Sequence, residues 1–225
     1  MKSILNGQQE KLMARLSKND LFDRKFYLTG GTALSEYYLH HRSSEDLDYF
    51  SMNEVDELWL ATLVKSLKEK TGAVESTIEQ SFNRNLVFFK YTERTVKMEF
   101  TYFPFAQIEK PQLRGGIRVD SLIDIAVNKF FTIYQKPSAR HFIDLYLILK
   151  KESGFDWEKL GRLARVKFDT NIDPIQLGSQ LVVAENISDL PIMVAEIKEE
   201  DWRDYFVTKA EELKGCGGVT GLTMI

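Results

Sequence analysis

Two aspartates separated by one residue are the first feature of the chain that could perform chemistry. Asp46 and Asp48 (the aspartate pair) lie in EDLDYFS, residues 45–51, which reads as a β-strand. Alternate side chains of a strand point to the same side, so both carboxylates share one face. At about 6 Å such charges repel by roughly 3 kcal/mol at an effective dielectric near 20. A cation removes this cost, and oxygen-only ligands favour Mg²⁺ or Mn²⁺.

A pair of glycines precedes these aspartates. Gly30 and Gly31 (the diglycine turn) follow a short predicted strand, KFYLT, at residues 25–29, and TALSEYYLHH then has helical spacing. Glycines allow a sharp turn and a close backbone approach, and a helix N-terminus attracts phosphate. The hydroxyl of Thr32 adds a donor there. If strands 25–29 and 45–51 are neighbours, a phosphate cradle and a metal pair face one pocket, as a nucleoside triphosphate requires.

Each half of this pattern also has a purely structural explanation. A Gly-Gly sequence alone is most often only a turn, and an isolated Asp-x-Asp is usually a solvated strand face. A glycine pair, a helix and an Asp-x-Asp strand within about 20 residues are harder to explain by chance. A shared binding function would explain why the chain tolerates both the flexible glycines and the repulsion between the aspartates.

The surrounding elements predict an α+β half followed by a helical half. Helices are predicted at residues 7–17, 32–41 and 55–70, and strands at 73–80, 84–92, 95–103 and 116–120. The strands 84–92 and 95–103 should form an antiparallel hairpin. Helices at 121–135 and 140–151 begin the second half. We therefore expect a core at 1–118, a helical domain at 119–213 that completes a ligand cleft, and a flexible tail at 214–225.

Composition limits the setting. The 225 residues carry a net charge of −3, which gives no global positive field for nucleic acid. A single cysteine, no signal peptide and no long apolar run indicate a cytoplasmic protein without a membrane span. Lys65, Lys68 and Lys70 could form a basic strip, although a solvated helix face is the favoured interpretation. Aromatic residues such as Phe88 and Phe89 are assigned to the core rather than to base stacking.

The stretch LTGGTALSEYYLHHRSSEDLDYFS resembles the opening motif of the AbiE-type toxin nucleotidyltransferases, members of the DNA polymerase β-like superfamily. The superfamily pattern is Gly-Gly or Gly-Ser, a helix, and Asp-x-Asp on the next strand. Gly30, Gly31, Asp46 and Asp48 occupy those positions. The family lettering Arg-x-Ser-x-Asp-Leu-Asp also matches, from Arg42 to Asp48.

A second signature resembles the same family. A helical lysine is followed on the next helix by Arg-x-x-x-Asp-Leu, and Lys129, Arg140 and Asp144 occupy the three charged positions. The resemblance covers about residues 26–150. One position departs from the superfamily pattern, because the candidate third carboxylate is Glu99 rather than aspartate. A solvated strand residue is the alternative interpretation of Glu99.

The resemblance implies a polymerase β-like mixed sheet with helices and an enzyme that transfers a nucleoside monophosphate from an NTP. Mg²⁺ or Mn²⁺ would be bound by Asp46, Asp48 and Glu99, and Lys129 and Asp144 would assist catalysis. Nucleotide contacts are expected from Gly30, Gly31, Thr32, Ser44, Lys129 and Arg140. The implied acceptor is tRNA or another RNA, and the implied setting is a toxin–antitoxin or phage-defence system with a cognate antitoxin. Alternatives are a small-molecule nucleotidyltransferase and an inactive nucleotide-binding regulator.

Overall fold

The computed structural model describes residues 3–216 and divides the chain into two compact units, Met1–Ile125 and Ala126–Ile225. The sequence placed this junction near residue 118, whereas the division falls within the helix Leu122–Gln135. Of the predicted tail, residues 214–216 belong to the last helix, and residues 217–225 lie outside the described residues.

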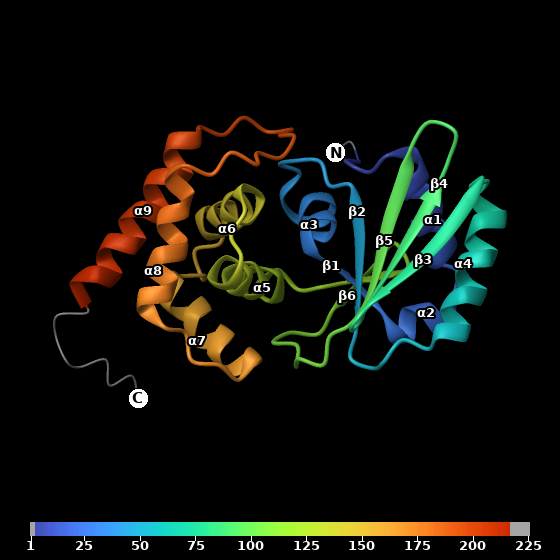
Figure 1. The fold of residues 1–225 in the computed structure, drawn as a ribbon, viewed down its shortest axis with the longest axis horizontal. Helices are drawn as coiled ribbons and strands as arrows, with labels where there is room; N and C mark the ends of the chain where they lie inside the picture. The colour runs from blue at the N-terminus through green and yellow to red at the C-terminus, as the bar shows by residue number, and fades with distance from the viewer. Residues whose placement is uncertain (1–2, 217–225) are drawn as a thin grey trace. The chain divides into compact units, whose positions relative to one another are not determined.

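The first unit combines short helices with strands (Figure 1). Its elements are α1 (Gly7–Leu16), α2 (Asp20–Lys25), β1 (Tyr27–Thr29), α3 (Gly30–Leu34), the π-helical turn η1 (Ser35–Leu39), β2 (Asp46–Ser51), α4 (Glu57–Thr71), β3 (Glu75–Ser81), β4 (Arg84–Lys90), β5 (Thr95–Tyr102), β6 (Gln112–Arg114) and β7 (Ile117–Val119).

The strands form a mixed seven-stranded sheet in the order β3-β4-β5-β2-β1-β7-β6. The strands β2 and β5 are parallel, and β1 is antiparallel to β2. The predicted hairpin of β4 and β5 is antiparallel, as expected. The mixed sheet with helices confirms the predicted fold class, and the pairing of β1 with β2 confirms that the two strands carrying the site are neighbours.

One face of the sheet is apolar and lies against helices. Leu47 and Tyr49 of β2 are fully buried, and the ring of Tyr49 lies 4.9 Å from that of Phe22 in α2. The rings of Phe26 and Trp59, the latter in α4, stack at 5.4 Å. Because side chains alternate along β2, the aspartate pair projects from the other face.

Local signals explain where α4 begins and ends. The side chain of Asp56 accepts a hydrogen bond from the backbone N–H of Trp59 at 2.7 Å and so caps the first turn. Gly72 ends the helix in the left-handed conformation, with φ of 76°. The buried residues Leu60, Leu63, Val64 and Leu67 lie at helical spacing on one side.

Three local features differ from the sequence prediction. The six-residue helix α2 includes Lys25, which was expected to begin a strand. The strand β6 pairs with β7 across Gly115 and Gly116, both with positive φ, where only a loop was expected. The helix after the diglycine turn ends at Leu39 in π-helical geometry, and His40 is left-handed with φ of 53°. None of these short features has the long periodicity by which elements are detected.

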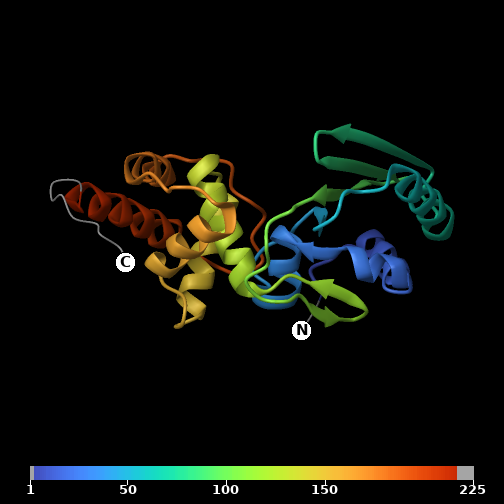
Figure 2. The same ribbon diagram turned by 90° about the horizontal axis from the view of Figure 1, so that it is seen from below.

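The second unit is helical (Figure 2). Beginning in α5 (Leu122–Gln135), it contains α6 (Ala139–Lys151), α7 (Trp157–Phe168), α8 (Pro174–Val182), the 3₁₀ turn η2 (Val183–Glu185) and α9 (Glu199–Cys216). The long α9 packs along α8 and α6. Its buried Phe206 lies 4.8 Å from the ring of Phe142 in α6, so aromatic contacts form this core. Across residues 3–216, no helix is both long and apolar enough to cross a membrane.

Candidate active site

The register of three neighbouring strands sets out the candidate site. Thr29 at the end of β1 is opposite Asp48 of β2, and Asp48 is opposite Glu99 of β5. Asp46 is opposite Lys97 on the same two strands. Residues directly opposite each other project from the same face. The carboxylates of Asp46, Asp48 and Glu99 therefore lie together on the face of the sheet opposite the apolar core.

The diglycine turn follows β1 and is shaped around the side chains of this site. Gly30 has φ of 71°, and a Cβ there would lie 2.5 Å from Oδ2 of Asp48. At Gly31 a Cβ would lie 2.5 Å from Nη2 of Arg42 and 3.0 Å from Oγ of Ser44. Real Cβ atoms do not approach so closely, and a left-handed φ strains other residues. Gly30 is therefore required to seat Asp48, and a side chain at position 31 would displace the ends of the Arg42 and Ser44 side chains.

Buried hydrogen bonds fix the turn and the start of β2. The hydroxyl of Thr32 donates to the backbone carbonyl of Asp46, and this threonine is fully buried. The side-chain amide of Gln9 donates to the carbonyls of Ser44 and Glu45 at 3.0 and 2.9 Å. In this structure the Thr32 hydroxyl, which the sequence assigned to phosphate, ties α3 to β2.

Thr29, the residue before the diglycine turn, is also bonded to the segment that follows β7, the neighbour of β1 on the side away from β2. The hydroxyl of Thr29 donates to the carboxylate of Asp120 at 2.7 Å, and both residues are buried. Backbone pairing of Leu28 with Val119 holds β7 beside β1. The conformation of the diglycine turn is therefore held by bonds on both sides of its strand.

The carboxylate of Asp46 has a cation beside it. Oδ2 of Asp46 accepts a hydrogen bond from Nζ of Lys97 at 2.8 Å, and the two side chains are 34% and 28% exposed. Lys97 lies directly across from Asp46 in the parallel pairing of β2 and β5. It offsets part of the like-charge repulsion that the sequence predicted for the aspartate pair.

Glu99 is buried and fully engaged. Its Oε1 accepts from Nε of Arg84 and from the hydroxyl of Thr101, both at 2.7 Å, and its Oε2 accepts from Nη2 of Arg84 at 2.5 Å. Burial of Glu99 acts to raise its pKa, but the hydrogen bonds from Arg84 and Thr101 outweigh burial and hold the pKa below its usual value. The hydrogen bonds that Arg84 donates to Glu99 also raise the pKa of Arg84. The pair is therefore ionised at neutral pH.

These contacts bear on the predicted metal ligands. Asp46 and Asp48 share one face and offer oxygen donors, which fits a hard divalent cation. Both oxygens of Glu99 are bound to Arg84 or Thr101. Within residues 3–216, no three His, Cys, Asp or Glu side chains are grouped as metal ligands. The donor set that fits is thus the aspartate pair, and the role of Glu99 as a ligand stays a prediction.

The remaining predicted residues lie in the second unit. Nζ of Lys129 on α5 lies 2.7 Å from Oδ2 of Asp144 on α6, with side chains 8% and 0% exposed. The Nδ1 atom of His141 lies 3.5 Å from the same Nζ. Arg140 is exposed. Lys129 and Asp144 thus form a buried ion pair that joins the two helices, and their part in catalysis stays a prediction.

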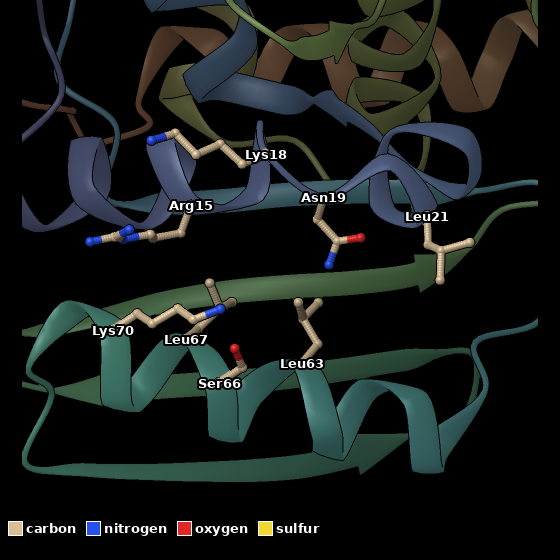
Figure 3. Close-up of a pocket in the computed structure, with 8 residues that line it drawn as sticks. All are labelled: Arg15, Lys18, Asn19, Leu21, Leu63, Ser66, Leu67 and Lys70. Carbon is tan, nitrogen blue, oxygen red and sulfur yellow. The ribbon is translucent and has the colours of Figure 1, made fainter.

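A cavity of about 320 Å³ lies elsewhere in the first unit, between the α1–α2 segment and α4 (Figure 3). Leu63 and Leu67 line its apolar side, and the basic residues at it are Arg15, Lys18 and Lys70. None of the predicted site residues lines it. Of the three lysines considered for a basic strip on α4, only Lys70 borders this cavity.

Arg84 and Lys97 are the charged residues of the site that the sequence prediction missed. A signal for Lys97 was present, because Lys97, Glu99 and Thr101 alternate along the strand TVKMEFTY and must share a face. Arg84 reaches Glu99 only through the pairing of β4 with β5. Phe88, assigned to the core, is only partly buried on this same face opposite Lys97, whereas Phe89 is fully buried.

Comparison with known proteins agrees with this geometry. Residues 11–213 match the family described as "Nucleotidyl transferase AbiEii toxin, Type IV TA system". An uncharacterized protein of Aquifex aeolicus (strain VF5), aq_aa25, is 28% identical over 216 residues, which is 94% of this chain and 98% of that protein.

Solved structures share the fold. MenT4, a nucleotidyltransferase toxin of Mycobacterium tuberculosis H37Rv, is similar with a TM-score of 0.62 and 18% identity, over 92% of this chain and 81% of that chain. JHP933 of Helicobacter pylori is similar with a TM-score of 0.60 and 19% identity, over 92% and 89%. The family match spans most of the chain, both signatures included, and the chain belongs to the AbiEii family of nucleotidyltransferase toxins.

Proposed function

We propose that this nucleotidyltransferase moves a nucleoside monophosphate from an NTP to a hydroxyl of tRNA or another RNA, with Asp46 and Asp48 holding the catalytic metal. A bond forms between the acceptor oxygen and the α-phosphorus, the bond to the bridging oxygen of the β-phosphate breaks, and pyrophosphate leaves. The hydroxyl proton passes to solvent. Membership of a type IV toxin–antitoxin family implies an NTP substrate and an antitoxin partner.

The observation that carries the proposal is the contact between the diglycine turn and Asp48. The Cα of Gly30 is so close to the carboxylate of Asp48 that a methyl group there would lie 2.5 Å from Oδ2. A group bound against the turn would therefore also lie against the carboxylates. Backbone N–H groups suit phosphate and carboxylates suit a divalent cation, so the combination supports a metal-bound triphosphate.

The aspartate pair would hold Mg²⁺ or Mn²⁺. When bound, such a cation neutralises charge on the triphosphate as pyrophosphate develops. The chain contributes the two carboxylates on one strand face, and Lys97 beside Asp46 keeps that carboxylate oriented. Glu99 is a weak base at neutral pH because its pKa is lowered, so we do not assign it the proton of the acceptor hydroxyl.

The other predicted contacts complete the proposal. Ser44, against Gly31, would contact phosphate, and Lys129 and Arg140 would bind the nucleotide as the family resemblance implies. Asp144 would orient Lys129 through their 2.7 Å ion pair. Phage defence follows from the same resemblance, whereas a cytoplasmic location follows from the sequence composition, and both belong to the proposal.

Transfer of label from an NTP tests the proposal. The protein is incubated with each α-³²P-labelled NTP, Mg²⁺ and bulk tRNA, and label in the RNA fraction is measured. We expect transfer by the wild type and a loss of about a thousandfold for Asp46→Asn and Asp48→Asn, because each removes a carboxylate that would hold the cation that neutralises charge on the triphosphate. Asp204→Asn, which changes an exposed aspartate of α9, is the matched control and should keep full activity.

Three outcomes would contradict the proposal in different ways. Wild-type transfer activity in Asp48→Asn would show that the reaction does not need the aspartate pair. Label in a small cationic molecule but not in RNA would favour a small-molecule nucleotidyltransferase. Absence of transfer to any acceptor, together with no NTP-dependent thermal shift, would indicate an inactive relative.

A further inference from the structure

Arg84 is a fixed, accessible cation beside the aspartate pair. Its Nε and Nη2 atoms bind the carboxylate of Glu99 at 2.7 and 2.5 Å, and that carboxylate also accepts from Thr101. The side chain of Arg84 is nevertheless 50% exposed, whereas that of Glu99 is 8% exposed. In the part of the chain that the structure describes, Nη1 of Arg84 has no hydrogen-bond partner. A guanidinium held through one edge presents its other donors in a fixed direction.

The order of the strands places Arg84 and the diglycine turn on opposite sides of the aspartate pair. The sheet runs β4-β5-β2-β1, with the aspartates on β2. The diglycine turn follows β1, one strand to one side. Arg84 belongs to β4, two strands to the other side, and it binds Glu99 on the intervening strand β5, where Glu99 is opposite Asp48.

The in-line geometry of nucleotidyl transfer assigns the leaving group to one side of the aspartate pair and the acceptor to the other. The attacking oxygen and the leaving pyrophosphate lie roughly in line on opposite sides of the α-phosphorus. If the triphosphate lies against the diglycine turn, as the proposed function holds, then pyrophosphate leaves on the β1 side. The acceptor must then approach from the side of β5 and β4.

We propose that Arg84 binds a phosphate of the RNA acceptor, and that Glu99 and Thr101 act as its anchor. This inference rests on the proposed function for the side from which the acceptor comes. It gives Glu99 a task other than metal binding: Glu99 is a positioning residue that acts through Arg84. The partly buried Phe88 on the same face of β4, opposite Lys97, gives a base a ring to stack on.

Stability alone accounts poorly for this arrangement. An ion pair whose arginine is half exposed adds only about 0–1 kcal/mol. Burial of the Glu99 carboxylate also costs solvation energy, which offsets part of what the ion pair contributes. The pair is better explained by a requirement for a cation held in one orientation. Carboxylate and phosphate both match a guanidinium edge, and phosphate is the one that RNA carries.

Binding of RNA without catalysis tests the inference. A fluorescein-labelled, single-stranded 20-nucleotide RNA is titrated with full-length protein in EDTA without NTP, and anisotropy gives Kd at several salt concentrations. We expect Arg84→Ala to weaken binding about tenfold and to reduce the slope of log Kd against log salt by about 1. Arg84→Lys should lose less RNA affinity than Arg84→Ala, because lysine keeps the positive charge although it lacks the paired N–H donors of a guanidinium group.

The matched control is Arg94→Ala, which removes an exposed arginine at the turn of the same hairpin. It should leave Kd within about twofold, because a lone surface cation contributes little. Glu99→Gln should weaken RNA binding through Arg84, so the double variant Arg84→Ala with Glu99→Gln should bind no more weakly than Arg84→Ala alone. Urea unfolding of each variant confirms that it is folded.

The NTP side of the site distinguishes failure of the inference from failure of the proposed function. Binding of NTP with Mg²⁺, followed by thermal shift, should be unchanged in Arg84→Ala. The inference is overturned if the wild-type protein does not bind the RNA, or if Arg84→Ala binds the RNA as tightly as Arg94→Ala does. It is also overturned if Arg84→Ala weakens the binding of NTP and leaves the binding of RNA unchanged. An Arg84-dependent RNA complex in a protein that transfers no label would instead contradict the proposed function alone.

Discussion

At the scale of single residues, the diglycine turn and Asp48 depend on each other. Gly30 is left-handed, and its Cα lies where only the absence of a side chain leaves room for Oδ2 of Asp48. A Cβ at Gly31 would lie 2.5 Å from Nη2 of Arg42 and 3.0 Å from Oγ of Ser44. The two glycines thus seat a carboxylate, a guanidinium and a hydroxyl in a small space.

Replacing Gly30 by alanine should separate this contact from general backbone strain. Gly30→Ala introduces a Cβ 2.5 Å from the Asp48 carboxylate, which must move. We expect transfer to fall at least about a hundredfold, since about 1 Å of misplacement has that effect. Gly72→Ala is the control, because its φ of 76° imposes similar strain but no atom lies within 4 Å of its Cβ.

Both alanine variants should lose about 1–2 kcal/mol of unfolding free energy in urea, the strain of a left-handed residue. Only Gly30→Ala should lose activity. Equal activities in the two variants would show that the close approach of Gly30 to Asp48 has no part in the reaction.

The ion pair of Glu99 and Arg84 predicts a dependence of stability on pH. The pKa of Glu99 is lower in the folded protein than its ordinary value of 4.5. The ionised carboxylate therefore stabilises the fold above about pH 4.5, and this contribution is lost as pH falls through the lower folded pKa. Glu99→Gln should be less stable than wild type at pH 7, and the difference should shrink below pH 4.5.

Urea unfolding of both proteins between pH 3 and pH 7 measures this difference. A matched comparison is Glu79→Gln on β3, where the glutamate is exposed. This variant should follow the wild-type profile throughout. A constant difference between Glu99→Gln and wild type across the range would contradict the assigned ion pair.

At the scale of elements, register determines which residues meet. Asp46 and Lys97 are 51 residues apart in sequence and meet because β2 and β5 pair in parallel. Glu99 reaches Arg84 through the antiparallel pairing of β5 with β4. Spacing along the chain predicts which side chains share a strand face, but it does not determine which strands are neighbours.

The helices α5 and α6 give the second unit its own buried charge pair. Removing one partner of the Lys129–Asp144 pair should cost about 3–5 kcal/mol, since the other charge stays buried and loses its partner at 2.7 Å. Replacing both, as Lys129→Met with Asp144→Leu, should recover most of that stability. If Lys129 also binds the nucleotide, the double variant is stable but inactive. Full activity in the stable double variant would show that the ion pair only joins α5 to α6 and has no part in the reaction.

At the scale of the whole molecule, the sequence was most informative where the signal is local. The aspartate pair, the diglycine turn and their neighbouring strands follow from spacing within one short segment, and the structure places them on adjacent strands. The short α2, the strand β6 and the π-helical η1 were missed, because they depend on tertiary packing rather than periodicity. For the same reason Arg84 and Phe88 could be assigned to the site face only from the sheet.

The fate of two labels in one NTP tests nucleotidyl transfer at the aspartate pair most directly. Wild type and Asp48→Asn are incubated with Mg²⁺, RNA and an NTP that carries label at either the α- or the γ-phosphate. The α-label should enter RNA while the γ-label leaves as pyrophosphate, and Asp48→Asn should do neither. Transfer of the γ-label to the acceptor, or transfer of the α-label by Asp48→Asn at the wild-type rate, would contradict a nucleotidyltransferase built on these carboxylates.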